Sequence, residues 1–125
     1  MKTLTIGDLK ARIPIIQGGM GVGISLSGLA SAVANEGGIG VISAAGLGLL
    51  YKKLSPSNYT EAGNLGLAEE IRKAREKAKG IIGVNVMVAL SDFAELVKTS
   101  IAEKVDIIFS GAGPVSYTHL TLPTT

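Results

Sequence analysis

The sequence has no cysteine, no tryptophan and a single histidine, and only 4% of its 125 residues are aromatic. Without cysteine the chain can form no disulfide, and it offers neither a thiol nucleophile nor a thiolate ligand. No cluster of histidine, aspartate and glutamate has metal-ligand spacing, so we expect no metal site. The lack of cysteine fits a reducing compartment, and we expect the protein to be cytoplasmic.

Charge and hydrophobic runs exclude two kinds of partner. The formal net charge is only +2, and lysine and arginine are spread along the chain, so no basic block points to nucleic acid. The sequence also lacks the run of about 18 uninterrupted apolar residues that a membrane-spanning helix requires. We therefore expect no nucleic acid and no membrane among the partners.

What the sequence contains is mainly apolar, with 46% hydrophobic residues that are mostly Ile, Val, Leu and Ala. This composition is typical of parallel strands covered by helices. Short apolar runs alternate with helical patterns, and such alternation predicts an α/β fold with right-handed parallel crossovers. A short cover strand is expected at residues 3–6. The predicted parallel strands cover residues 14–17, 38–43, 81–88 and 105–109.

Two of the predicted helices have clear start signals. The first is expected to be capped by Ser25 or Ser27 and to stop at Gly37, because glycine readily adopts a left-handed conformation. Residues 44–63 are long for a connection and are expected to form a binding loop or lid. Asn64 is then the expected cap of the second helix.

The chain is organised around Ile13–Ile24, where a short apolar run enters a glycine cluster. Because glycine has no Cβ, a flat or anionic ligand can lie directly against the peptide groups there. A tight strand-to-helix turn would explain one such cluster, but Asn85 and a second glycine segment at residues 110–113 also lie at or near the carboxyl ends of strands. Ligands of α/β folds bind at that edge. The clustered glycines are Gly18, Gly19, Gly21 and Gly23.

Two polar residues interrupt or flank the apolar strands. Asn85 lies inside a strand, where a buried amide without a partner costs about 1–3 kcal/mol. It is either a structural amide bonded to a neighbouring loop or a ligand contact. Asp106 lies near the start of the fourth strand, away from the ligand-binding edge, and we expect it to be structural.

The common nucleotide motifs are absent. No stretch reads Gly-x-Gly-x-x-Gly between a strand and a helix, and no Gly-x-x-x-x-Gly-Lys-Ser/Thr occurs. A dinucleotide-binding Rossmann site and a P-loop are therefore both disfavoured.

Four other segments occur in order: Pro14-Ile-Ile-Gln-Gly-Gly-Met-Gly, Gly37-Gly-Ile-Gly-Val-Ile, Gly83-Val-Asn-Val-Met and Phe109-Ser-Gly-Ala-Gly. Together they resemble the flavin-dependent nitronate monooxygenases, formerly called 2-nitropropane dioxygenases. The related flavin-type enoyl-(acyl carrier protein) reductases share the pattern. The resemblance implies the N-terminal half of a (β/α)8 TIM-type barrel that binds FMN at its carboxyl face. It also implies a small-molecule substrate, an alkyl nitronate, for the complete enzyme.

The resemblance further implies which positions contact the cofactor. The glycine segment matches backbone that lies against the flavin ring, and the asparagine matches an amide that bonds flavin heteroatoms. Ser110 and Gly111 match a segment that lies beside the flavin. No catalytic residue is assigned, because the family's histidine base lies in a later segment that this chain lacks. The implied cofactor-binding residues are Gly19, Met20, Gly21, Asn85, Ser110 and Gly111.

The resemblance divides the chain in two. Residues 1–113 are expected to form a partial FMN-binding barrel domain, inactive by itself. Residues 114–125 depart from the family pattern and resemble translated vector sequence, so we expect a flexible polar tail whose His119 is not the catalytic base. A half barrel leaves strand edges and inner faces open, and we expect self-association through them. An enoyl reductase and a non-catalytic fragment remain alternative interpretations.

Overall fold

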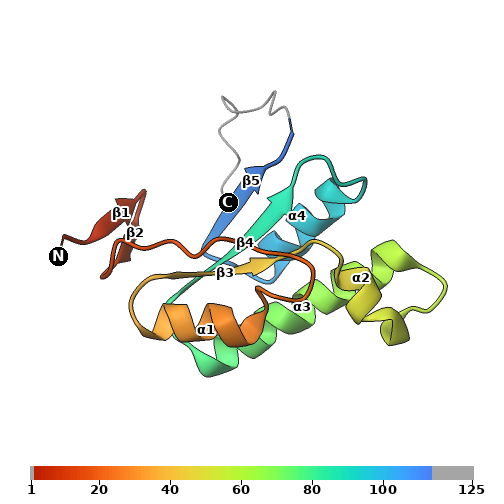
Figure 1. The fold of residues 1–125 in the computed structure, drawn as a ribbon, viewed down its shortest axis with the longest axis horizontal. Helices are drawn as coiled ribbons and strands as arrows, with labels where there is room; N and C mark the ends of the chain where they lie inside the picture. The colour runs from red at the N-terminus through yellow and green to blue at the C-terminus, as the bar shows by residue number, and fades with distance from the viewer. Residues whose placement is uncertain (1, 114–125) are drawn as a thin grey trace.

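The computed structural model describes residues 2–113, in which a twisted sheet carries helices along one side (Figure 1). Residues 114–125, with the predicted tail and His119, lie outside the described residues. None of the helices within residues 2–113 combines the length and the apolar character of a membrane span. The elements are β1 (Leu4–Ile6), β2 (Leu9–Ala11), α1 (Ser27–Asn35), β3 (Ile39–Ser43), α2 (Leu47–Leu50), η1 (Lys52–Leu54), α3 (Tyr59–Lys77), β4 (Ile81–Met87), α4 (Phe93–Ala102) and β5 (Ile107–Gly111).

The central sheet has three parallel strands in the order β3-β4-β5. Its register places Ser43 beside Asn85, and Asn85 beside Phe109. Strands alternate with helices along the chain, which confirms the predicted parallel α/β architecture. The apolar runs at the second, third and fourth predicted strands therefore form β3, β4 and β5.

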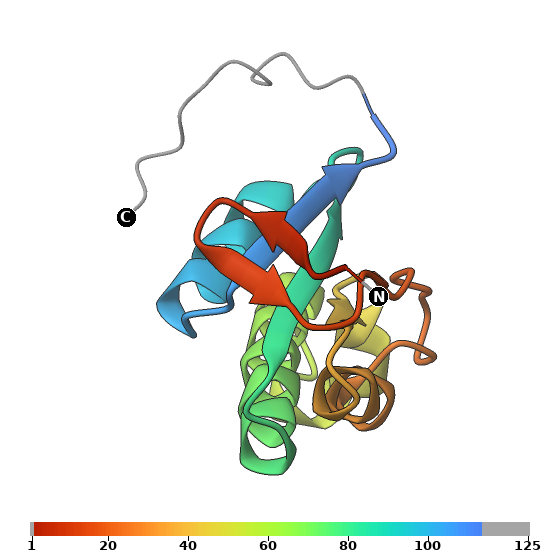
Figure 2. The same cartoon turned by 90° about the vertical axis from the view of Figure 1, so that its left-hand side faces the viewer.

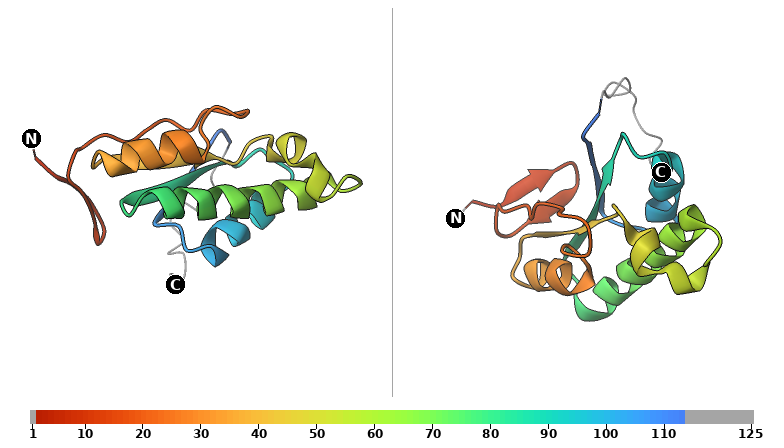
Figure 3. Two further views of the ribbon diagram at one scale, coloured as in Figure 1. Left: turned by 90° about the horizontal axis from the view of Figure 1, so that it is seen from below. Right: turned by 45° about the vertical axis from the view of Figure 1, so that its right-hand side comes forward.

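The two faces of the sheet are covered differently. On one face, alternate strand residues such as Ile42, Val84 and Val86 are buried against α1, α3 and α4, which lie along the sheet in Figure 3. On the other face, which we call the inner face, Val41 and Phe109 belong to a second apolar cluster with residues of β1 and β2. The β1–β2 hairpin crosses this face in Figure 2, so the expected cover strand is present as half of a hairpin.

The predicted first strand, residues 14–17, is wrong as a regular strand. Only Ile16 pairs with Ile39, as an isolated parallel bridge. Beyond it the ladder is completed by a side chain, because the Gln17 amide donates to the Val41 carbonyl and accepts from the Val41 N–H, both at 3.0 Å. Pro14, which has no N–H to donate, limits pairing at the other end. The segment still runs beside β3 and delivers the glycines to the carboxyl end of the sheet.

The expected serine cap of α1 is also wrong. The N-cap residue is Leu26, and no side-chain cap bond is present. The backbone N–H of Ser27 donates instead to the carboxylate of Glu70, on α3, at 2.8 Å. A tertiary contact has replaced the local cap, whereas the predicted stop at Gly37 is confirmed by its φ of 96°.

Residues 44–63 are not one long loop, because they contain α2, η1 and the start of α3. The cap of α3 is Asn58, whose side chain accepts from the N–H of Glu61 at 3.0 Å, and not Asn64. Asn64 lies inside the helix and donates to the Thr60 carbonyl. Both asparagines offer the same capping chemistry, so local pattern alone could not choose between them.

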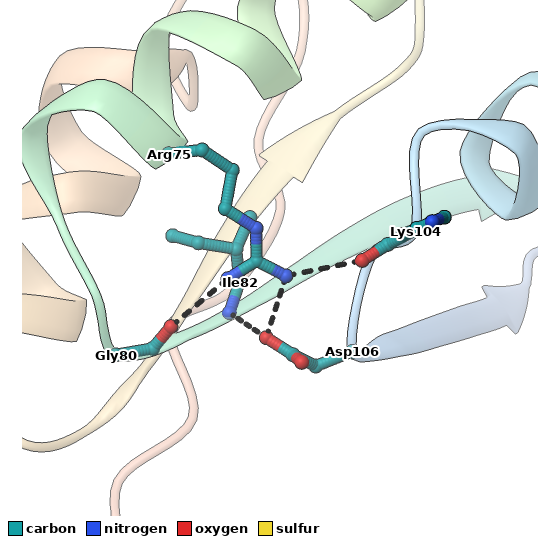
Figure 4. A network of polar contacts seen from close by, with 5 residues as sticks. All are labelled: Arg75, Gly80, Ile82, Lys104 and Asp106. Carbon is teal, nitrogen blue, oxygen red and sulfur yellow. Dashed lines mark hydrogen bonds and ion pairs between the residues drawn. The ribbon is translucent and has the colours of Figure 1, made fainter.

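Asp106 is structural, as predicted (Figure 4). Its Oδ2 accepts from the backbone N–H of Ile82 and from the guanidinium of Arg75, both at 2.9 Å. Arg75 also donates to the carbonyls of Gly80 and Lys104. The cluster fastens α3 to the amino ends of β4 and β5, opposite to the edge where the glycines lie.

Candidate functional site

The glycine segment lies directly against Asn85. A Cβ atom added at Gly19 would be 2.5 Å from the Cβ of Asn85, closer than real atoms approach. A Cβ added at Gly21 would be 3.0 Å from the Cβ of Ala45 and 3.1 Å from the Oγ of Ser43. The structure therefore brings these glycines and Asn85 together at the carboxyl ends of β3 and β4, although Asn85 lies 66 positions after Gly19 in the chain.

Asn85 faces the inner side of the sheet, since its neighbours Val84 and Val86 are buried on the helix side. Its backbone carbonyl accepts from the N–H of Ala44 at 3.0 Å. Its side-chain amide has no hydrogen-bond partner within residues 2–113. Every buried side-chain N or O atom in this part of the chain has a partner. The amide of Asn85 is therefore not fully buried and reaches the surface. A structural bond to a neighbouring loop, the first of the two predicted roles, is therefore not found there.

The backbone of the glycine segment also has open donors. Within residues 2–113 the N–H groups of Gly19 and Gly21 have no acceptor, whereas the N–H of Met20 is bonded to the hydroxyl of Ser25. The side chain of Met20 is 58% exposed. Within the described part of the chain, two peptide donors and one primary amide are thus open beside each other; we call this edge, formed by Gly19, Gly21 and Asn85, the inner rim.

The two residues predicted on β5 lie on opposite faces. Gly111 pairs in register with Met87 and follows Phe109 on the inner face, whereas Ser110 pairs with Val86. Side chains alternate along a strand, so the Ser110 side chain lies on the helix side with that of Ile108. Gly111 shares the rim with Asn85, and Ser110 can reach it only through its backbone.

A buried carboxylate that the sequence patterns did not indicate lies at the start of α1, which follows the glycine segment. Glu70 is 4% exposed and accepts from the backbone N–H of Ser27 and from the hydroxyl of Tyr51. Burial raises the pKa of Glu70, but the hydrogen bonds from Tyr51 and Ser27 outweigh it, so the pKa is lowered and the side chain is charged at neutral pH. Its position three residues after Leu67, on the apolar stripe of α3, is the sequence signal that could have revealed it.

The charge of Glu70 limits how an anionic ligand can bind. The free N–H groups at a helix N-terminus favour phosphate, but the start of α1 is already occupied by this carboxylate. The glycine segment is therefore suited to a neutral planar group rather than to a phosphate held at the following helix.

A small cavity lies next to the rim, between the segments that follow β3 and β4. It has a volume of about 70 Å³ and is lined in part by Ala44, Gly46 and Asp92. Ligand pockets usually measure about 300–1,000 Å³, so this cavity holds no more than the end of a ligand. A ring-sized group would lie on the inner face itself.

A family model described as nitronate monooxygenase matches residues 2–115. The chain belongs to the nitronate monooxygenase family. A comparison with curated proteins gave no match. Similar solved structures include FabK from Thermotoga maritima, with 31% identity and a TM-score of 0.63 over 80% of this chain and 27% of that chain. A FabK single-substitution mutant from the same organism has 32% identity and a TM-score of 0.62, over 80% of this chain and 29% of that one.

This nitronate monooxygenase family chain spans less than a third of the length of those FabK structures. The predicted fold class, the N-terminal half of a (β/α)8-type barrel, is confirmed by the parallel sheet together with this partial match. The family is one of flavin-dependent oxidoreductases. The bare peptide groups of Gly19 and Gly21 beside the open amide of Asn85 fit the polar edge of a flavin ring.

Proposed function

We propose that this chain supplies one wall of the flavin site of an FMN-dependent nitronate monooxygenase whose small-molecule substrate is an alkyl nitronate. The observation that carries the proposal is the Asn85 amide, which has no partner within residues 2–113, beside the N–H groups of Gly19 and Gly21, which have no acceptor in the same range. Polar groups left open together at the carboxyl ends of parallel strands are typical of a ligand site. We place the complete enzyme in the cytoplasm.

Each residue has a distinct part in binding. The peptide donors of Gly19 and Gly21 bond the polar edge of the ring, and the missing side chains allow the ring to lie close to the backbone. The Asn85 amide, which can donate and accept, orients the ring in its plane. Met20 covers the ring edge against water, and the backbones of Ser110 and Gly111 border it on β5. The flavin itself supplies the redox chemistry.

A flavin-type enoyl-(acyl carrier protein) reductase is the second candidate. It is kept because the similar solved structures are of FabK, and because the rim on this chain would serve a flavin in either enzyme. The two are separated in the complete enzyme by measuring oxygen consumption with an alkyl nitronate against oxidation of a reduced nicotinamide.

The flavin site on this chain is tested by titrating the purified chain with lumiflavin, which has the ring but no phosphate, and with FMN. We expect weak, saturable quenching of fluorescence for both ligands, with similar affinities, because the rim contacts only the ring. Asn85→Ala should weaken binding about tenfold, the loss expected for one or two hydrogen bonds.

The matched control is Asn35→Ala, since the Asn35 amide bonds the Lys77 carbonyl at the far end of α1. This variant should bind lumiflavin as the wild type does. If the wild-type chain shows no saturable binding, or if the Asn85 variant binds equally well, the proposed site is wrong and the chain is a non-catalytic fragment without a flavin wall.

A further inference from the structure

Ser25 is a buried residue whose hydrogen bonds close the glycine segment into a loop. Its side chain is 1% exposed. The hydroxyl accepts from the backbone N–H of Met20 at 2.9 Å and donates to the carbonyl of Gly18 at 3.2 Å. The backbone N–H of Ser25 donates to the carbonyl of Met20 at 2.9 Å. Gly19, between the two bonded residues, is thereby held on both sides.

The same residue ties the loop to the sheet. The carbonyl of Ser25 accepts from the backbone N–H of Ser43 at 2.8 Å, at the carboxyl end of β3. Ser43 is the register partner of Asn85. A short chain of bonds therefore connects the peptide groups of Gly18–Met20 with the strand position that carries the open amide.

Packing holds the loop only in part. Gly19 and Gly21 lie against the carboxyl ends of β3 and β4 and Val22 lies against Gly46, but Met20, Val22 and Ile24 are 58%, 49% and 61% exposed. Within residues 2–113 no side chain other than that of Ser25 bonds the backbone of residues 18–24. The Ser25 hydroxyl does not cap α1, because no side chain makes a cap bond at the start of this helix.

We propose that Ser25 is a positioning residue for the flavin ring: its hydroxyl keeps the N–H groups of Gly19 and Gly21 at the distance from Asn85 that one planar ligand can span. The inference rests on the proposed flavin site. It assigns Ser25 no contact with the ring and no part in the chemistry. Its role is to fix the loop before the ligand arrives, which lowers the entropy cost of binding.

The test compares Ser25→Ala with Ser31→Ala in the full chain. Ser31 is 4% exposed, and its hydroxyl donates to the Gly28 carbonyl at 3.1 Å inside α1, without touching the loop. Both variants lose one buried hydroxyl, so both should lower the melting temperature. Only Ser25→Ala should speed hydrogen–deuterium exchange at the Met20 amide, and weaken lumiflavin binding, each by about tenfold.

The outcomes separate this inference from the proposed function. Equal exchange at Met20 in the two variants overturns the role of Ser25, whatever the chain binds. If the two variants differ in exchange as expected but the wild-type chain binds no lumiflavin, the flavin site is overturned instead. If Ser25→Ala does not fold, Ser25→Cys serves, because the thiol is similar in size but a weak hydrogen-bond group; normal Met20 protection in that variant overturns the inference.

Discussion

The carboxylate of Glu70 caps a helix to which it does not belong: it accepts the backbone N–H of Ser27, the first residue of α1, at 2.8 Å. The Tyr51 hydroxyl donates to the same carboxylate, and the Lys73 ammonium lies 3.7 Å from it. A negative charge is favourable at a helix N-terminus. One buried charge therefore joins α1 and α3 to the segment between α2 and η1, next to the glycine loop.

This arrangement predicts acid sensitivity. Burial raises the pKa of Glu70, but the hydrogen bonds from Tyr51 and Ser27 lower it by more than burial raises it. The pKa in the folded state therefore lies below the ordinary value of 4.5. A carboxyl with a depressed folded pKa adds stability above its unfolded pKa and loses that contribution as the pH falls through the folded value. We expect the free energy of unfolding to decrease below pH 4.5.

Urea unfolding of the wild type and of Glu70→Gln at several pH values measures this contribution. The variant should be less stable by about 1–3 kcal/mol at neutral pH, because hydrogen bonds to a charged group are lost. The difference should shrink on acidification. A difference that is constant from neutral pH down to strongly acidic pH would assign the acid sensitivity to other carboxyls.

Gly40 allows α1 to pack directly on β3. A Cβ added at Gly40 would lie 1.9 Å from the backbone carbonyl oxygen of Ala30, which cannot move without shifting the helix. Gly40→Ala should therefore lower the free energy of unfolding by about 3 kcal/mol or more. Gly28→Ala, on the α1 helix that packs against Gly40, is the control, because a Cβ at Gly28 would have no atom within 4 Å. This variant should leave the free energy of unfolding unchanged or raise it by up to about 1 kcal/mol. Thermal unfolding of both variants checks the contrast.

The Asp106 cluster of Figure 4 should matter for stability and not for ligand binding. Asp106→Ala removes the acceptor of the Ile82 N–H and the partner of Arg75, and we expect a loss of about 1–3 kcal/mol. Glu103→Ala is the comparison, since it breaks an ion pair with Arg72, whose side chain is 62% exposed; such pairs contribute about 0–1 kcal/mol. Lumiflavin affinity should be unchanged in both variants.

The chain should self-associate through its open edge. Within the described residues β5 pairs only with β4, and Ile15 and Ile16 are 55% and 44% exposed beside β3. Unpaired strands and exposed apolar side chains favour association. Sedimentation velocity over a range of concentrations should show a sedimentation coefficient that rises with concentration. A single monomeric species at every concentration would contradict this expectation.

The elements that could be predicted from the sequence are those with local causes. The apolar runs of β3, β4 and β5, and the stop at Gly37, follow from side-chain polarity and from the conformational freedom of glycine. The structural role of Asp106 followed from its place at the start of a strand. The errors at residues 14–17, Ser25 and Asn64 share one feature: a side chain that the local pattern did not single out makes the hydrogen bond, namely that of Gln17, of Glu70 and of Asn58 respectively.

The sequence by itself determined that parallel strands would alternate with helices, and that glycines would follow the first strand-like segment, because periodicity and the lack of a Cβ act over a few residues. Only the tertiary structure decided that Gly19 packs on Asn85, and that Glu70, on another helix, caps α1. Those contacts join residues whose positions relative to one another depend on how the helices pack on the sheet, and no local pattern records that packing.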